Sequence, residues 1–425
     1  MLNIKKNIEP YRTLVKNFTS LSILQITNYL FPLITLPYLV RVLGPEKYGL
    51  VNFAMAFVAY FVTISDYGFN LSVTKQISIF RADKQKINEI FSSVIISKFL
   101  YSIISLVILL AITISFNRFS ADSNVFLFSF GIVIGNTLFP IWFYQGIEEM
   151  KFITIITFIC RSIGTVMIFL IINDVNDYLQ LVMIYSSIAI VIGIAGLTVA
   201  IQKFKVLIVF PKLSSVRFQI KEGFQIFISI AAINLYSTTN IFLLGLLVND
   251  TAVGYFAAAD KIRTAAQNIL PTISQTVFPH INKLLNESYD KFIAFNRNLL
   301  KYQSMISLFI SLVLFMFAEE IVNLILGNQF PESILVLKIL SILPFLSSFT
   351  TIFAVNTLIP LDLKNEFMKT FLIAGVFSFA SALFLVPVYK QFGTAIAFVL
   401  AEVIAAFLSF SYVKRKTNLF ARKWI

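Results

Sequence analysis

The first uncharged stretch of the sequence runs from Asn17 to Val40 and reads NFTSLSILQITNYLFPLITLPYLV. A helix of about 20 mostly apolar residues spans the hydrocarbon core of a bilayer, so this stretch predicts a transmembrane helix. Basic residues precede it, as in a signal peptide, but the apolar region of a signal peptide has only about 7–15 residues. The stretch therefore predicts a retained membrane span.

The composition extends this interpretation to the whole chain of 425 residues. Hydrophobic residues make up 58% of it and charged residues 13%, whereas soluble domains carry about 25% charged residues. The sequence predicts an all-α integral membrane protein. One cysteine, Cys160, excludes a disulfide framework, and one histidine, His280, excludes a multi-histidine metal site. We expect neither a metal nor a cofactor.

Windows of low charge predict how many helices cross the membrane. Twelve windows are long enough, when single charged interruptions are allowed. They lie near residues 17–40, 48–65, 88–117, 123–146, 152–173, 178–202, 223–249, 251–282, 302–318, 333–359, 370–389 and 391–413.

The basic residues predict the orientation of these spans. Of the 34 Lys and Arg residues, 25 fall in the termini and in alternate loops, four fall in the other loops, and five fall inside spans. Cytoplasmic loops are enriched in Lys and Arg, so we expect both termini in the cytoplasm. The net charge of +13 thus reflects membrane topology, and we expect no nucleic-acid partner.

The longest basic loop divides the chain into two halves. We expect an N-terminal lobe over 1–205 with six spans, a cytoplasmic linker over 206–222, and a C-terminal lobe over 223–425 with six spans. A weak internal repeat agrees with this division, because Leu39–Gly49 (LVRVLGPEKYG) and Leu244–Gly254 (LGLLVNDTAVG) share spacing. Transporters often consist of two such repeats with a site at their interface.

Ionisable residues inside spans are the strongest pointers to function, because each costs about 2.5–3.5 kcal/mol or more to insert. Lys98 and Arg161 interrupt spans three and five, and Asp260 and Arg263 share a face of span eight. Polar side chains accompany them in spans one and seven. Together they predict a polar, mainly cationic interior with these binding candidates: Arg41, Lys98, Arg161, Lys261, Arg263, Asn28 and Asn234.

Each candidate also has a structural interpretation. Lys98 can snorkel to the membrane surface, Arg161 can form a structural salt bridge, and Asp260 can neutralise Arg263 three residues away. Glu402 is either a helix-packing residue or a proton site. The aromatic run Trp142–Tyr144 is typical of an aromatic belt at the membrane interface.

The surplus of buried cations predicts an anionic cargo. The five basic candidates outnumber the acidic residues of the spans, and Arg and Lys bind phosphate oxygens strongly. We therefore expect a phosphate-bearing substrate, with ion coupling assigned to Asp66, Asp260 and Glu402.

Several motifs resemble one family of transporters. These are Pro37–Gly49 (PYLVRVLGPEKYG), Asp66–Asn70 (DYGFN), Pro140–Gly146 (PIWFYQG), and Val253–Phe256 leading to Asp260–Arg263. In this order they resemble the Wzx-type O-antigen flippases, in the polysaccharide transport branch of the MOP (MATE-like) superfamily. The resemblance covers essentially the whole chain.

The resemblance implies a V-shaped fold of two six-helix lobes around a cationic cavity. It also implies transport of an undecaprenyl-diphosphate-linked oligosaccharide from the cytoplasmic to the periplasmic leaflet of the bacterial inner membrane. Membrane lipids, a polysaccharide polymerase and a chain-length regulator are the partners that it suggests.

Two other functions remain open on the sequence. The first is a related exporter of the same superfamily that carries a cell-wall precursor lipid or an organic cation. The second is a membrane-embedded polysaccharide polymerase, which would carry a sizeable periplasmic loop with clustered charges. The loops on that side are short and poor in charge, so we expect a transporter and not an enzyme.

Overall fold

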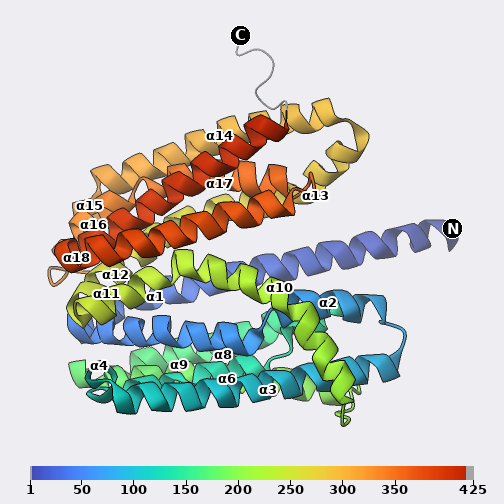
Figure 1. Cartoon of the computed structure of the whole chain (residues 1–425), viewed down its shortest axis with the longest axis horizontal. Helices are drawn as coiled ribbons and strands as arrows, with labels where there is room; N and C mark the ends of the chain where they lie inside the picture. Colours follow the sequence, from blue (N-terminus) through green and yellow to red (C-terminus); the bar gives the residue numbers. More distant parts are fainter. Residues whose placement is uncertain (1, 418–425) are drawn as a thin grey trace. The chain divides into compact units, whose positions relative to one another are not determined.

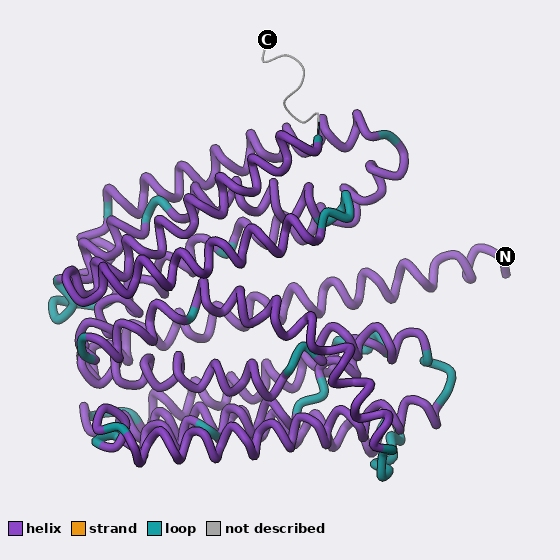
Figure 2. The backbone as a smooth tube through the Cα atoms, in the orientation of Figure 1, coloured by secondary structure: helices purple, strands orange, loops and turns teal. Residues whose placement is uncertain are grey.

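The computed structural model describes residues 2–417, with side chains from residue 23 onward except at positions 225, 229, 233, 235–237, 269, 272, 275, 276 and 279. Within residues 2–417 the chain is helical and contains no strand, and short loops join the helices (Figure 2). This confirms the all-α prediction for that range. Arg422 and Lys423, which belong to the basic tail that predicts a cytoplasmic C-terminus, lie outside the described residues.

Two compact units make up the chain, and each unit consists of two separate stretches of sequence. Unit 1 comprises Met1–Leu43 and Ala54–Ala231, and unit 2 comprises Gly44–Phe53 and Ala232–Ile425. A ten-residue piece of the first helix therefore packs with the second half of the chain.

The helices of unit 1 follow the chain from its N-terminus (Figure 1). They are α1 (Leu2–Asp66), α2 (Phe69–Ile79), α3 (Lys84–Ser115), α4 (Asn117–Ser120), α5 (Ser123–Ser129), α6 (Gly131–Leu138), α7 (Ile141–Gly146), α8 (Lys151–Ile171), the 3₁₀ turn η1 (Val175–Asp177), α9 (Tyr178–Gln202) and α10 (Leu213–Ser237). The middle of α1 and the end of α10 belong to unit 2. Helix α9 packs against α6 and α8, and α2 packs against α7.

Unit 2 contains the remaining helices. They are α11 (Thr239–Leu247), α12 (Asp250–Gln267), α13 (Ile269–Glu287), α14 (Tyr289–Met316), α15 (Ala318–Ile325), α16 (Glu332–Leu340), α17 (Leu343–Thr350), the π-helix η2 (Thr351–Leu358) and α18 (Lys364–Lys416). Helix α18 contacts α11, α16 and α17, and α12 packs against α16.

Two of the helices are each a pair of helices joined at a backbone break. In α1 the break is Gly44, with φ 65°, a left-handed conformation that glycine adopts without a steric penalty. In α18 the break is Lys390, with φ 51°. Just beyond it, a Cβ on Gly393 would lie 2.2 Å from the carbonyl oxygen of Leu385. The chain therefore turns back tightly, and Ala374, Ala401 and Ala405 form a small buried cluster in α18.

Eight helical segments among the described residues are long and apolar enough to cross a membrane. They contain ten of the twelve predicted spans, since Ile23–Ile79 and Lys364–Lys416 each hold two. The predicted spans at 223–249 and 251–282 are not among them. In that region α12 carries Asp250, Asp260, Lys261 and Arg263 within 18 residues. The full count of twelve and the orientation of the termini remain predictions.

Helix α3 has its polar residues inside and its apolar residues outside. Lys98, Ser102 and Ser105 are buried, whereas Ile103 and Val107 are exposed. A helix of a soluble protein has the opposite pattern, with the apolar face buried against the core. The arrangement is the one expected when lipid surrounds the outer face of the helix.

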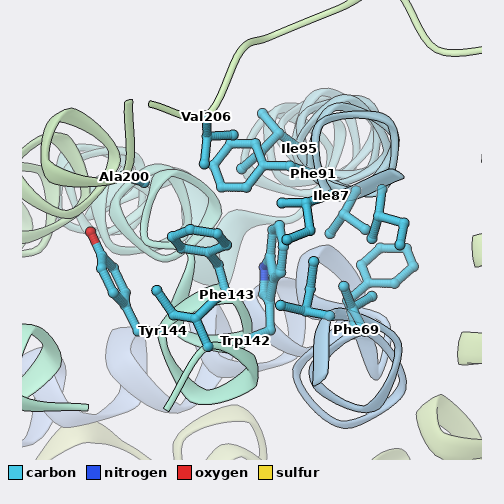
Figure 3. Packing of buried hydrophobic residues seen from close by; sticks show 14 of the residues in the cluster. Phe69, Ile87, Phe91, Ile95, Trp142, Phe143, Tyr144, Ala200 and Val206 are labelled. Atoms are coloured by element: carbon cyan, nitrogen blue, oxygen red, sulfur yellow. The ribbon is translucent and has the colours of Figure 1, made fainter. Parts of the chain in front are cut away.

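The aromatic run after Pro140 lies in the core of unit 1. Trp142, Phe143 and Tyr144 are at most 2% exposed and pack with Phe69 and Phe91 (Figure 3). Phe143 meets Phe91 edge to face, with ring centroids 5.5 Å apart. The interpretation of these residues as an interfacial aromatic belt is therefore wrong. Their sequence position suggested a membrane interface, but these residues of α7 are packed against α2, α3 and α9.

The two repeated segments of the sequence contact each other inside unit 2. A Cβ on Gly49 would lie 1.7 Å from the backbone oxygen of Asp250, and a Cβ on Gly254 would lie 2.0 Å from the backbone oxygen of Pro45. Small residues allow helices to approach at backbone distance. Pro45 and Asp250 occupy equivalent positions of the two repeats, as Gly49 and Gly254 do. The contact is therefore reciprocal: the glycine of each repeat lies against the same position of the other repeat. This contact fastens Gly44–Phe53 to α12.

We expect Gly254→Ala to lower the unfolding temperature of the purified protein by several degrees. Overpacking costs about 1–3 kcal/mol, and against a rigid carbonyl oxygen this outweighs the gain of about 1 kcal/mol in helix propensity. Gly164→Ala is the matched control, because its Cβ would meet only side-chain atoms of Ile188, Cδ1 at 1.9 Å and Cγ1 at 2.9 Å, and a flexible side chain can move away where a carbonyl oxygen cannot. Equal unfolding temperatures for the two variants would contradict the role of the reciprocal contact.

Candidate functional site

A buried ion pair lies at the centre of the polar interior of unit 1. The Lys98 Nζ atom lies 3.0 Å from Asp66 Oδ1 and donates to the carbonyl oxygen of Asn136 at 3.0 Å. The Lys98 side chain is 1% exposed and that of Asp66 15%, so the lysine does not snorkel. Asn70 donates to the other oxygen of Asp66 at 2.6 Å.

Helix ends explain why this pair forms. Asp66 is the last residue of α1, where the helix dipole disfavours a negative charge. The ammonium group of Lys98, which α3 brings to this helix end, offsets that cost. Two residues predicted for different roles, substrate binding and ion coupling, are therefore partners.

Three hydroxyl groups extend the polar interior beside the ion pair. The hydroxyl oxygen of Ser65 lies 3.0 Å from that of Ser102 and 2.7 Å from that of Thr137, and the hydroxyl oxygens of Ser102 and Thr137 are 2.6 Å apart. The three residues come from α1, α3 and α6 and are almost fully buried. Hydroxyls both donate and accept hydrogen bonds, so this group can rearrange when a neighbouring charge changes.

Arg161 and Asn28 form the second polar contact of unit 1. The Nη1 group of Arg161 in α8 donates to Oδ1 of Asn28 in α1. No carboxylate among the described residues pairs with Arg161, so a structural salt bridge is absent there. On the same helix Thr154 and Thr157 are buried. The structure thus brings together two predicted binding residues and leaves the guanidinium charge without a counter-charge.

Arg263 is the best-connected charged residue of unit 2. Its Nε and Nη2 groups donate to Asp260 Oδ1 at 2.8 and 2.6 Å, and Nη2 donates to Thr264 Oγ1 at 2.7 Å. Nη1 donates to Gln267, whose amide donates to Ser347 at 3.0 Å. The proposed neutralisation of Arg263 by Asp260 is therefore confirmed, and the side chain is only 8% exposed.

Helix α18 adds an aromatic ring to this cluster and carries a buried carboxyl group nearby in the sequence. The guanidinium carbon of Arg263 lies 5.4 Å from the ring centre of Phe398, within the range of a cation–π interaction. Glu402 follows one turn later, is buried, and makes no hydrogen bond or ion pair with the described residues. A buried carboxyl group without a partner is costly unless it is protonated or binds a cation.

The remaining predicted binding residues lie apart from these clusters. Lys261 is exposed although its neighbours Ile262 and Arg263 are buried, and Arg41 is exposed just before the break at Gly44. Asn234 in α10 is half-buried, and its carbonyl oxygen accepts from Thr239 at 3.3 Å.

A cluster of amides in unit 2 was missed by the sequence analysis. Asn296 and Gln303 of α14 and Asn356 of η2 are at most 1% exposed. Oδ1 of Asn296, Oδ1 of Asn356 and Nε2 of Gln303 have no hydrogen-bond partner among the described side chains and backbone. The sequence prediction rested on charged residues inside spans and on amides of spans one and seven, and it did not include Gln303 of span nine or Asn356 of span ten. An uncharged polar side chain in an apolar window is the signal that would have found these two.

The amino-acid sequence of the chain is similar to that of a known protein family and of two named proteins. A family described as "Polysaccharide biosynthesis protein" matches residues 14–285. A protein of Escherichia coli (strain K12) named "Putative O-antigen transporter" is 33% identical over 407 residues, which are 96% of this chain and 98% of that protein. A protein of the same name from Shigella dysenteriae is 30% identical over 94% of this chain and 100% of that protein.

Solved structures identify the fold. The chain is similar to the inward-facing conformation of a multidrug resistance MATE family transporter of the MOP superfamily, with a TM-score of 0.69 and 13% identity over 95% of this chain and 98% of that one. A MATE structure in a bent conformation gives a TM-score of 0.59 at 14% identity. At such low identity the likeness concerns the fold alone, which is MATE-like.

We expect Asp66→Asn or Lys98→Met to destabilise the protein by about 3 kcal/mol, because each change leaves a buried group unpaired. The double variant should lose less than the sum of the two single changes. Thermal unfolding in detergent measures both effects.

The exposed pair Lys283–Glu287, with an N–O distance of 3.8 Å, is the matched control. Lys283→Met and Glu287→Gln should change stability by less than about 1 kcal/mol and show little coupling. Additive losses at Asp66 and Lys98 would contradict the ion pair.

Proposed function

This chain belongs to the polysaccharide biosynthesis protein family, and from that membership we propose that it is a flippase for a lipid-linked oligosaccharide. The cargo is an undecaprenyl-diphosphate-linked repeat unit of O-antigen or a similar surface polysaccharide. The protein moves it from the cytoplasmic to the periplasmic leaflet of the bacterial inner membrane by alternating access. The relatives named as O-antigen transporters, which match nearly the whole chain, support this proposal.

The observation that carries the proposal is the uncompensated guanidinium of Arg161. Among the described residues its hydrogen-bond partner is a neutral amide, Asn28, and buried Thr154 and Thr157 lie about two turns and one turn earlier on the same helix. A cation in such surroundings binds an anion more strongly than one that is already paired, and guanidinium groups bind phosphate oxygens in a bidentate manner. Arg161 is therefore the first contact for the diphosphate in unit 1.

Arg263 has a different role in the proposal. Its guanidinium is held by Asp260, Gln267 and Thr264, so a diphosphate has to share it with Asp260 or displace that carboxylate. Protonation of Asp260, or a cation bound to it, would release Arg263 for the cargo. This links the predicted coupling residues Asp66, Asp260 and Glu402 to substrate binding, since Asp66 holds Lys98 in the same way.

The other parts of the cargo have suitable surroundings. Hydroxyl and amide groups such as Ser102, Thr137 and Asn28 offer hydrogen bonds to a glycan, and the polyprenyl tail stays in lipid beside the exposed apolar faces of helices such as α3. The membrane potential assists export, since each negative charge moved outward gains about 2.3 kcal/mol per 100 mV. Lys261 and Arg41 contribute positive charge, and Asn234 adds a polar group.

Two alternatives differ in the cargo or the reaction. An exporter of a cell-wall precursor lipid or of an organic cation would share this fold, but a cation cargo disagrees with an uncompensated arginine. A membrane-embedded polymerase is disfavoured because the relatives are named as transporters. A polymerase and a chain-length regulator are instead partners that would act on the exported repeat unit.

We expect the double variant Arg161→Ala and Arg263→Ala to lose surface polysaccharide in a cell that depends on this protein. The loss should be at least about tenfold, because two charge-assisted contacts of about 1.5–3 kcal/mol each are removed. Surface polysaccharide is measured by gel analysis and lectin or antibody binding, with membrane abundance measured in parallel.

Lys283→Ala and Lys364→Ala remove the same charge from exposed positions, with side chains 73% and 77% exposed, and serve as the control. Arg161→Lys separates charge from geometry, and we expect partial activity because the bidentate contact is lost. Normal polysaccharide from a well-expressed Arg161→Ala, Arg263→Ala variant would exclude the diphosphate site.

A further inference from the structure

A cationic pocket lies within unit 1, apart from the polar interior described above. It has a volume of about 260 Å³ and lies where α3 begins and where the chain leaves α9. Arg81, Lys84 and Lys205 line it together with aromatic side chains. The loops at this end of unit 1 are the basic ones, so the topology prediction places the pocket on the cytoplasmic side.

The charges of the pocket are free to receive an anion. Lys84 and Lys205 are exposed and form no ion pair or hydrogen bond with the described residues. Arg81 is held in place, because it donates to the carbonyl oxygen of Ile147 at 2.5 Å and pairs with Glu148 at 3.0 Å. The lining carboxylate of Glu149 is neutralised by Lys151 at 3.0 Å. The pocket therefore carries a net positive charge.

The backbone around the pocket is fixed in an unusual conformation. Lys205 and Glu148 both have positive φ, at 54° and 60°, which is uncommon for residues other than glycine. Such strained positions persist where surrounding contacts hold them, and they cluster at binding sites. One such contact is the hydrogen bond from the Leu207 amide to Oδ1 of Asn88 at 3.0 Å.

The inner wall of the pocket is apolar. Phe143, Ile147 and Phe204 line it, and Ile87, Val206 and Phe143 belong to the same aromatic cluster as Trp142 (Figure 3). Ligand pockets for drug-sized molecules are about 300–1,000 Å³, so this pocket suits a phosphate headgroup and not an oligosaccharide. A cationic rim over an apolar wall matches an amphiphile whose phosphate lies outside and whose chain lies inside.

We propose that this pocket binds a phosphate group carried on an apolar chain, that is, the headgroup of an anionic membrane lipid. The amino groups of Lys84 and Lys205 bind the phosphate oxygens, Arg81 orients the site, and the first carbons of the chain lie on Phe143 and Phe204. The cytoplasmic leaflet of a membrane supplies such headgroups, and basic pockets on that side bind them. The site does not depend on the cargo that the protein carries.

Tryptophan fluorescence gives a direct test, because Trp142 packs against the pocket wall, with its ring 6.5 Å from that of Phe143. The other tryptophan, Trp424, is replaced by Phe so that Trp142 reports alone. The full chain is placed in phosphatidylcholine nanodiscs, and phosphatidylglycerol with brominated acyl chains is titrated in. Brominated phosphatidylcholine at the same mole fraction measures quenching by lipid that contacts the protein at random.

The structure predicts extra quenching by the brominated phosphatidylglycerol, with half-saturation at low mole fraction. Lys84→Gln with Lys205→Gln should shift the half-saturation point about 25-fold, since each of the two basic residues near an anionic surface contributes about a fivefold factor. Arg81 is left intact because its contacts with Ile147 and Glu148 hold the fold. Lys283→Gln with Lys364→Gln removes the same charge elsewhere and should leave the quenching unchanged.

A second arm distinguishes a free phosphate from a lipid headgroup. Inorganic diphosphate is added to the protein in phosphatidylcholine nanodiscs, and Trp142 fluorescence is measured. A saturable change in this fluorescence, together with no extra quenching by brominated phosphatidylglycerol, would assign the pocket to a soluble phosphate. That result would overturn the lipid assignment. Equal quenching by the two brominated lipids without a diphosphate response would overturn the site altogether. Equal shifts of the half-saturation point in the Lys84→Gln, Lys205→Gln variant and in the Lys283→Gln, Lys364→Gln control would also overturn the site.

Discussion

An ionised side chain among apolar helices has to have a partner, and this constraint organises the interior of both units. Lys98 and Asp66 satisfy it with each other, at 3.0 Å, and the same pair joins the end of α1 to α3. Arg263 satisfies it within its own helix, through Asp260 and Gln267. Arg161 has no counter-charge among the described residues, and Glu402 has no described partner at all. At these two positions an anionic ligand or a proton would meet the constraint.

This distribution suggests how cargo and coupling ion compete. In the proposed mechanism, two of the cations that attract a diphosphate, Lys98 and Arg263, are held by carboxylates in the absence of cargo. Binding of the diphosphate to either cation would release its carboxylate. A carboxylate set free in this way has to take up a proton or a cation, because a lone buried charge is costly. On this proposal, substrate binding and ion binding would be connected through ordinary electrostatics, and Asp66 and Asp260 would have equivalent roles in the two units.

The glycine contacts impose a second constraint, on the backbone. Gly49 and Gly254 each lie so close to the backbone of the other repeat that a methyl group at either position would clash with that backbone. They occupy equivalent positions of a sequence repeat, and their contact is reciprocal. The short piece Gly44–Phe53 thus packs in unit 2 while the rest of α1 packs in unit 1. Two of the motifs that carry the family resemblance, those containing Gly49 and Gly254, are therefore packing elements.

Much of the fold was readable from the sequence, because apolar windows need no knowledge of tertiary contacts. Asp260 and Arg263 were also predictable partners, since three residues along a helix places them on one face. Lys98 and Asp66 are 32 residues apart and Arg161 and Asn28 are 133 apart, so their pairing depends on how helices pack. Packing also decides that Trp142 is buried and that the amide of Asn356 lies in the core.

The most direct test of the central claim, that buried cations recognise the diphosphate, is a translocation measurement in proteoliposomes. One fluorescent oligosaccharide is attached either to a polyprenyl diphosphate or to the same polyprenyl chain through an uncharged linker. The account predicts rapid translocation of the diphosphate form and at least about tenfold slower translocation of the neutral form. Equal rates for the two lipids would contradict it.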